Sequence, residues 1–342
     1  METRVVIALL AVLIAGASPA CGPSNRDGAA PQRAHVRVAI GGQSQLLYLP
    51  TTLAQQLGYY RDEGLDVELQ DFAGGSKALE ALVGGSADVV SGFYDHTIQM
   101  QAQNREMTAF VSMLRFPGLV LVTSPQAAPA VKTIADLKGR IVGVTTAGSS
   151  SNMLFNYLAQ RAGLSADAVS ITAIGGAATA IAAIEHGKVD AGMMADPAFT
   201  LVRNRNPSIR VLAELRTAEG VKQAFGSDTY PASVLYSQGA WIRANRATVQ
   251  HLARAIVRTL DWMHKHSAQE IANAVPAGFR GDDPALYVQA LESSLPMFSP
   301  DGVMAADGAE SVHTLLAGSM PAVRSARIDI AKTYTNEFVN GR

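Results

Sequence analysis

The chain has 342 residues, of which only 17% are charged, and its formal net charge is −1. This length suits one or two domains with full cores. The sequence has no basic stripe, which argues against nucleic acid as a partner. It also has no histidine-rich tract, so we expect no bound metal, and no motif in it indicates a cofactor.

The N-terminus resembles a secretory signal segment. Residues 5–15 are all apolar and are followed by small residues up to Cys21, the one cysteine of the chain. This run is too short to span a bilayer stably. The position of Cys21 predicts cleavage before it and lipid attachment to it, so that residues 1–21 are a signal peptide; ordinary cleavage after Ala20 is the alternative. Residues 22–34 have the composition of a flexible tether.

Alternating or continuous apolar runs predict strands and helices in turn along residues 35–123. Strands are expected at 36–40, 65–69, 89–90, 109–113 and 119–122, with helices at 50–58, 75–84 and 97–103. We assign this segment to a first lobe. Two prolines in the stretch 124–130 predict the first crossing between lobes there.

The second lobe is expected over residues 124–228, with strands at 140–144 and 209–212 and a helix at 151–162. The chain is expected to return to the first lobe near Asp228, so that residues 229–342 belong to lobe 1. An amphipathic helix is predicted there from apolar residues spaced three or four apart, namely Val249, Leu252, Ala253, Ile256, Leu260 and Met263.

Residues 73–89 and 174–191 have the same pattern: a glycine-rich loop, a short apolar helix, a glycine stop, and an aspartate before an apolar strand. Two similar α/β units imply two similar lobes, and two lobes imply a cleft. Helices between strands indicate parallel pairing with right-handed crossovers.

Three glycine-rich loops follow predicted strands, where ligands bind in open parallel sheets. Glycine allows backbone N–H groups to turn towards a ligand, and each following helix adds the positive end of its dipole. Such loops surround oxyanions well. Helix capping by serines and simple chain turns are the alternative interpretation. The candidate ligand-binding residues in these loops are Gly42, Gln43, Ser44, Gly75, Ser76, Gly148, Ser149 and Ser150.

Four further residues near strand ends are candidates for the cleft. Tyr94 could stack on a ligand or donate from its hydroxyl. Asp95 either caps the next helix or recognises an amino or hydroxyl group. Arg115, between two strands, either pairs with a carboxylate or sulfonate or lies in a solvated turn. Asp196 either binds a polar group or serves the hinge.

Several segments, in their order along the chain, resemble the periplasmic binding proteins of nitrate, sulfonate and taurine importers, the NMT1/THI5-like family. The segments that resemble this family are 58–69, 134–139, 148–150, 187–191, 299–302 and 329–339. The resemblance implies a type II periplasmic-binding-protein fold, an α/β fold in which two Rossmann-like lobes close over a small solute.

The resemblance implies a solute-binding subunit of an ABC importer, which hands its solute to the transmembrane permease subunits. From the glycine loops we expect a small organic anion, a sulfonate or carboxylate. We expect a monomer in the periplasm or at the cell surface, held at the membrane by the lipid alone. No catalytic motif such as Gly-x-Ser-x-Gly is present, so we expect no enzyme. The alternatives are a pyrimidine-precursor-binding protein, an enzyme of the same fold such as the pyrimidine synthases of thiamine biosynthesis, and the periplasmic partner of a sensor.

Overall fold

The computed structural model describes residues 33–340. The predicted signal peptide, Cys21 and all but the last two residues of the predicted tether lie outside the described residues. Across residues 33–340, no helix has both the length and the apolar character needed to cross a bilayer.

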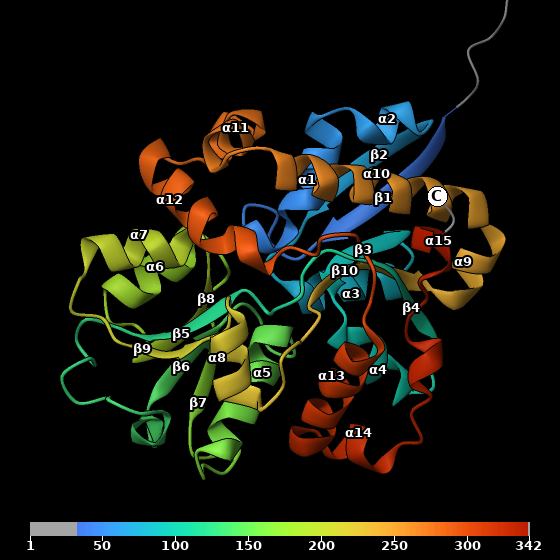
Figure 1. The fold of residues 1–342 in the computed structure, drawn as a ribbon. Coiled ribbons are helices and arrows are strands. Elements are labelled where there is room, and N and C mark those ends of the chain that lie inside the picture. Colours follow the sequence, from blue (N-terminus) through green and yellow to red (C-terminus); the bar gives the residue numbers. More distant parts are fainter. Residues whose placement is uncertain (1–32, 341–342) are drawn as a thin grey trace, which may run out of the picture. The chain divides into compact units, whose positions relative to one another are not determined.

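The described residues form two five-stranded sheets, one in each lobe of an α/β fold (Figure 1). The strand order of the first sheet is β2 (Leu65–Asp71), β1 (Ala34–Ile40), β3 (Val89–Phe93), β10 (Ser233–Gln238), β4 (Met107–Ser112). That of the second is β7 (Ser170–Ala173), β6 (Ile141–Val144), β8 (Ala191–Ala195), β5 (Leu119–Thr123), β9 (Val211–Glu214). In each sheet the first three strands in this order pair in parallel, and the fourth is antiparallel to both its neighbours. The two lobes therefore have the same topology, which confirms the predicted fold.

Helices cover both sheets, as the crossovers require. The first lobe has α1 (Leu49–Gln56), α2 (Tyr59–Asp62), α3 (Gly75–Val83) and α4 (Asp95–Gln101). The second has α5 (Ser150–Arg161), α6 (Ala178–Glu185), α7 (Ala198–Arg205) and α8 (Ala218–Phe225). The C-terminal helices are α9 (Gly239–Ala244), α10 (Arg246–Lys265), α11 (Ala268–Ala274), α12 (Pro284–Ser294), α13 (Ala306–Ser319), α14 (Pro321–Ser325) and α15 (Glu337–Asn340). Short 3-10 helices are η1 (Leu46–Tyr48), η2 (Ile134–Leu137), η3 (Ala277–Phe279), η4 (Leu295–Met297) and η5 (Ile330–Lys332).

The repeated aspartate of the two α/β units has the same structural role in both lobes. Asp88, just before β3, accepts hydrogen bonds from the Arg37 backbone (2.9 Å) and guanidinium (2.7 Å) on β1. Asp190, just before β8, accepts them from the Ile141 backbone (2.9 Å) and the Arg140 guanidinium (3.1 Å), at the start of β6. Each aspartate therefore joins the first and third parallel strands of its own lobe at their amino ends, away from the cleft.

The first crossing between lobes differs from the prediction. Strand β5, expected in the first lobe, pairs with β8 and β9 of the second sheet, so the chain crosses at 113–118 and not at 124–130. The returning segment runs beside it: Met113 donates to the Ser233 carbonyl (2.7 Å) and Ala232 to the Leu114 carbonyl (3.1 Å). Two hydrogen-bonded crossing strands are well suited to act as a hinge.

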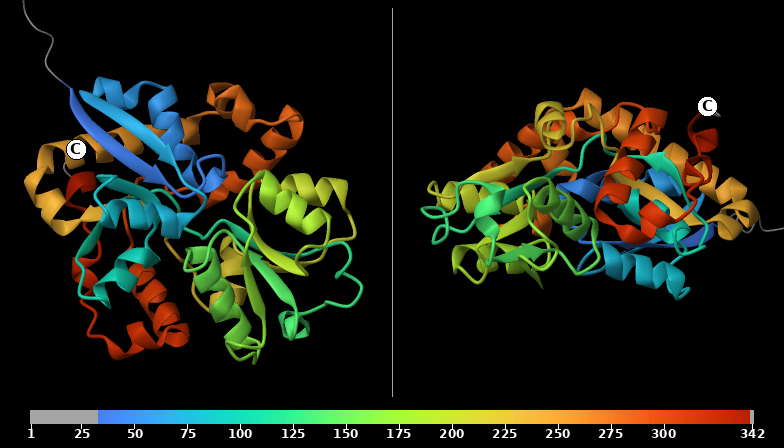
Figure 2. Two further views of the ribbon diagram at one scale, coloured as in Figure 1. Left: turned by 180° about the vertical axis from the view of Figure 1, so that it is seen from behind. Right: turned by 90° about the horizontal axis from the view of Figure 1, so that it is seen from below.

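The C-terminal helices pack on both lobes, although the sequence assigned them to the first. The predicted amphipathic helix is α10, and its apolar face is buried against the first lobe. Further on, α12 packs against α7, and α13 packs against α5 and α4. Figure 2 shows the same arrangement from behind, with the orange α12 beside the yellow-green α7. The second lobe is thus held by the C-terminal segment as well as by the hinge.

Candidate functional site

A small cavity lies between the two lobes, at the carboxyl ends of the parallel strands. Its volume is about 20 Å³. Both lobes line it, as expected for a ligand site in this kind of sheet. The first lobe provides Gly41, Gln45, Leu47, Tyr48, Gly75 and Phe93, and the second provides Leu119, Thr145, Ser149, Ser150 and Ser151.

The glycine pairs allow the lobes to approach each other closely. A Cβ atom on Gly74 would lie 2.6 Å from the Thr146 hydroxyl, and one on Gly176 would lie 2.5 Å from the Gln45 amide. Both distances are too short for a side chain. The glycine loop of each repeat therefore receives a side chain from the loop that follows the first parallel strand of the other lobe, β6 for Thr146 and β1 for Gln45. This explains why both repeats contain glycine there.

Hydrogen bonds join the lobes around the cavity. The Ser76 and Thr146 hydroxyls are 2.9 Å apart. The Leu46 N–H donates to the Asp196 carbonyl (2.9 Å), and the Ser150 hydroxyl donates to Asp95 Oδ1 (2.7 Å). The last bond is buried at both ends, so closure brings a carboxylate of one lobe onto a hydroxyl of the other.

The predicted loop 148–150 is only partly directed at the cavity. Gly148 is exposed, and its N–H donates to the side chain of Asn152 (3.1 Å). Ser149 and Ser151 form a triangle of hydroxyls with Thr145, at 2.8–3.0 Å. Ser149 and Ser150 line the cavity, and the Ser150 hydroxyl reaches the other lobe.

The predicted loop 42–44 lies beside the cavity and leads into it. Gly42 has a φ of 103°, a conformation that favours glycine. The Gln43 N–H donates to Asp71 (2.7 Å), and Ser44 is half-buried. The residue that enters the cavity is the next one, Gln45, which is 2% exposed and whose amide donates to the Gly41 carbonyl (3.0 Å).

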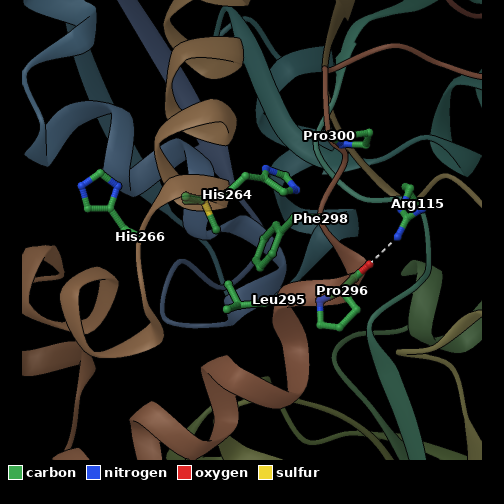
Figure 3. Close-up of a pocket in the computed structure, with 8 residues that line it drawn as sticks. Arg115, His264, His266, Leu295, Pro296, Phe298 and Pro300 are labelled. Carbon is green, nitrogen blue, oxygen red and sulfur yellow. Dashed lines mark hydrogen bonds between the residues drawn. The ribbon is translucent and has the colours of Figure 1, made fainter.

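Tyr94 and Arg115 lie away from the interlobe cavity. The buried Tyr94 hydroxyl bonds Thr333 (2.5 Å), inside the first lobe. Arg115 lines a separate cavity of about 370 Å³ and donates to the Pro296 carbonyl (2.8 Å), as Figure 3 shows. The side chains of that second cavity are mainly apolar, with His264 and His266 at its edge (Figure 3).

Asp196 is the centre of a buried hydrogen-bond network. It is 1% exposed, and its carboxylate accepts from Arg216 (2.7 Å), from the Thr200 hydroxyl (2.6 Å) and backbone, and from Ser294 (3.1 Å) of α12. Arg216 also bonds Glu214. The Asp196 carboxylate therefore joins the second lobe to the C-terminal segment.

Asp95 is the first residue of α4, and no side chain caps that helix, so the capping interpretation is wrong. Burial raises the pKa of Asp95, although nearby His96 and the Ser150 hydrogen bond act in the opposite direction. Burial lowers the pKa of His96. His96 bonds the Tyr236 hydroxyl (3.3 Å). The site therefore places two buried ionisable groups behind the cavity wall, in an environment that disfavours the charge of either.

Sequence reasoning missed Gln45, Tyr48 and Phe93 in the lining, and Thr146 at the lobe contact. Gln45 is adjacent to a predicted loop, and Phe93 lies three residues after the predicted strand 89–90. Their positions in the chain could have suggested them. Tyr48 lies within η1, and the sequence has no comparable signal for it.

Comparisons with known proteins agree with this architecture. A protein from Bordetella bronchiseptica RB50 of solved structure is 42% identical, with a TM-score of 0.86 over 90% of this chain and 96% of that one. The alkanesulfonate-binding protein SsuA from Xanthomonas axonopodis pv. citri, bound to MOPS, is 21% identical, with a TM-score of 0.71 over 90% and 99%. The 4-amino-5-hydroxymethyl-2-methylpyrimidine phosphate synthase of Aspergillus parasiticus is 26% identical over 63% of each chain.

The profile of one family, described as NMT1/THI5 like, matches residues 47–270, which is more than half of the sequence. The matched region includes both repeated α/β units and all residues that line the interlobe cavity except Gly41 and Gln45. The chain belongs to the NMT1/THI5-like family.

Proposed function

We propose that this protein is the solute-binding subunit of an ABC importer, which captures a small organic solute between its lobes and delivers it to a permease. The observation that carries the proposal is the cavity whose walls come from strand-end loops of both lobes. A protein built in this way must open to admit a solute and close to hold it. The likeness to SsuA, named as an alkanesulfonate-binding protein, supports this role.

Closure is the first step to test. A cavity of about 20 Å³ holds about one water-sized group, so a larger solute requires the lobes to move apart and close around it. The hinge strands at 113–115 and 230–233 are the axis that we expect for this movement. The contacts of Gly74 with Thr146 and of Gly176 with Gln45 run across the cleft, as expected for surfaces that separate and rejoin.

A disulfide across the cleft provides the test. The Ser76 and Thr146 hydroxyls are 2.9 Å apart, so cysteines at both positions would be within reach of a disulfide. The double variant Ser76→Cys, Thr146→Cys is made with Cys21→Ser, because Cys21 is the chain's one native cysteine. We expect small-angle scattering to give a smaller radius of gyration for the oxidised protein than for the reduced one. Ser76→Cys with Cys21→Ser is the control, and its radius should not respond to oxidation. Equal radii for the double variant in both states would argue against closure.

The anionic head group predicted from the glycine loops is not part of this proposal. Among residues 33–340, no lysine or arginine lines the interlobe cavity, and the buried Asp95 lies directly behind Ser150. An anion would therefore meet hydroxyls and helix N-termini but also the buried carboxyl group of Asp95.

We also propose that the protein works in the periplasm or at the cell surface, anchored through lipid on Cys21. The support is the apolar run 5–15 followed by small residues and a lone cysteine. A lipidated terminus is a firm anchor only with several acyl chains. We expect the wild-type protein in the membrane fraction and Cys21→Ser in the soluble fraction. Wild-type protein found entirely in the soluble fraction would contradict the anchor.

An enzyme of the same fold is the second candidate, because the relative from Aspergillus parasiticus is named as a synthase. The two functions differ in the fate of the solute. A binding protein returns its solute unchanged, at about one molecule per chain, whereas an enzyme releases altered product over many turnovers. Mass spectrometry of the solution after prolonged incubation with a cell extract separates the two.

A further inference from the structure

Most of the buried polar atoms that lack a hydrogen-bond partner lie near the interlobe cavity. Over residues 33–340 they are Gln45 Oε1, Tyr60 Oη, Asp95 Oδ2, His96 Nε2, Tyr230 Oη and Ser233 Oγ. Native proteins leave few such atoms unpaired, and each needs an explanation. Most of these atoms belong to residues in or behind the interlobe cavity wall.

The positions of these residues are fixed by their neighbours. Gln45 lines the cavity, and Asp95 bonds Ser150, which also lines it. The His96 ring lies behind Gly75, where a Cβ atom would be 3.1 Å from Cε1. Ser233 pairs with the cavity-lining Phe93 in the register of β10 and β3.

Asp95 is the group for which the missing partner matters most. The residue is 0% exposed; Oδ1 accepts from Ser150, and Oδ2 has no partner. The neutral Tyr230 hydroxyl and the His96 backbone N–H lie close enough to lower the pKa of Asp95, but neither meets Oδ2 in full hydrogen-bond geometry. A buried carboxylate without a cation is strongly disfavoured, unless a partner arrives to pair with it.

No other part of the site provides that partner. The cavity lining contains no arginine or lysine. The titratable groups around Asp95 are His96 from the same helix, Tyr48 from η1, and Tyr230 and Tyr236 from the returning segment and β10. The tyrosines are neutral, and burial lowers the pKa of His96 although Asp95 raises it, so none of these groups is a permanent cation beside the carboxylate.

The aromatic residues in the lining favour the same kind of partner. The rings of Tyr48 and Phe93 lie edge to face with centroids 6.5 Å apart, and both line the cavity. Aromatic faces attract cations and offer nothing comparable to an anion. Carboxylate, aromatic rings and the absence of basic side chains together describe a site for positive charge.

We propose that the solute presents a positively charged N–H donor group, an ammonium or amidinium, to the free oxygen of Asp95, while Ser150 of the closing lobe holds the other oxygen. The inference rests on the proposed function and names the chemical class of its solute. It makes closure depend on the solute, since the same carboxylate receives both the solute and the second lobe.

The test uses two defined pools of small molecules, one of primary amines and amidines and one of sulfonates and carboxylates, matched in carbon skeleton. Native mass spectrometry records which masses the wild-type protein retains. We expect retention from the cationic pool. Asp95→Asn keeps the shape but removes the charge and places an N–H donor at the site, so it should weaken retention of those masses at least about tenfold. Asp88→Asn, at the far end of the strands, is the control and should retain them as the wild type does.

The outcomes are distinguishable. Retention from the anionic pool, or equal retention of amines by Asp95→Asn and the wild type, would overturn the inference and leave solute binding intact. Retention from neither pool would count against the solute-binding function itself. A pH series adds a second measurement: retention of amines should rise with pH as Asp95 ionises, because burial raises its pKa. A fall in retention over the same range would contradict the role given to Asp95.

Discussion

Asp196→Ala should strongly destabilise the protein. Its buried carboxylate accepts four hydrogen bonds, from Arg216, from the Thr200 hydroxyl and backbone, and from Ser294. The substitution leaves the two hydroxyls without their acceptor. Arg216, only 12% exposed in its side chain, keeps Glu214 as its one remaining carboxylate.

The magnitude follows from these contacts. Breaking a buried ion pair by removing one partner costs about 3–5 kcal/mol. Arg216 is not left alone, because Glu214 holds it at 2.6–2.8 Å. The loss should therefore fall in the lower half of that range, about 3–4 kcal/mol. A loss of this size lowers the melting temperature by several degrees or more in a protein of this length.

Urea denaturation monitored by circular dichroism measures the change in the free energy of unfolding. The matched control is Asp190→Ala in the same lobe, whose carboxylate is 25% exposed and pairs with a half-exposed Arg140. It should lose clearly less stability. A single charge-assisted hydrogen bond contributes about 1.5 kcal/mol. If Asp196→Ala lowers the free energy of unfolding by less than that, or by no more than the control does, then the Asp196 network does not hold the second lobe to the C-terminal segment.

Three further changes test other parts of the structure. Gly118→Ala in the first crossing should cost about 1–3 kcal/mol in thermal unfolding, because the residue has a φ of 69° and a Cβ atom would lie within van der Waals overlap of Leu47; no loss would contradict the hinge geometry. His96→Gln should flatten the dependence of the free energy of unfolding on pH below about 6.5: burial lowers the folded-state pKa of His96, so the unfolded chain binds the proton first and stability falls as pH decreases. An unchanged slope would show that His96 titrates freely. Tyr94→Phe should lose about 0.5–1.5 kcal/mol of stability with its bond to Thr333 but leave solute retention unchanged; a loss of retention would return Tyr94 to the site.

The repeated units could be predicted because their signals are local. Glycine stops and apolar periodicity at 73–89 and 174–191 predict a loop, a helix and a strand in each, and α3, β3, α6 and β8 lie there. Strand β7 has no such signal. It is an edge strand with mainly exposed residues, so it lacks the apolar pattern that burial imposes on a strand.

The first crossing could not be located from periodicity. Strands β4 and β5 are both largely apolar, and the residues between them, Arg115 to Gly118, suit a hairpin turn as well as a crossing. Which sheet receives β5 depends on pairing with β8, more than sixty residues later. The same limit applies to the site. Ser150 could be selected from its loop, but its contact with Asp95 exists only when the two lobes meet.

The two lobes share a topology, yet they use their buried aspartates differently. Each has one shortly after its third parallel strand: Asp95 after β3 and Asp196 after β8. Asp196 has a guanidinium and three further donors, so its charge is compensated within the protein. Asp95 accepts a full hydrogen bond from Ser150 of the opposite lobe, and the other groups near it are the neutral Tyr230 hydroxyl, the His96 backbone N–H and the His96 ring. In a symmetric cleft both lobes would contact the solute in the same way, and the buried carboxylates of the two lobes would have the same role. Here one carboxylate fixes the scaffold and the other is left incompletely paired behind the cavity wall. We therefore expect the chemical selectivity for the solute to reside mainly in the first lobe, while the second lobe closes over it.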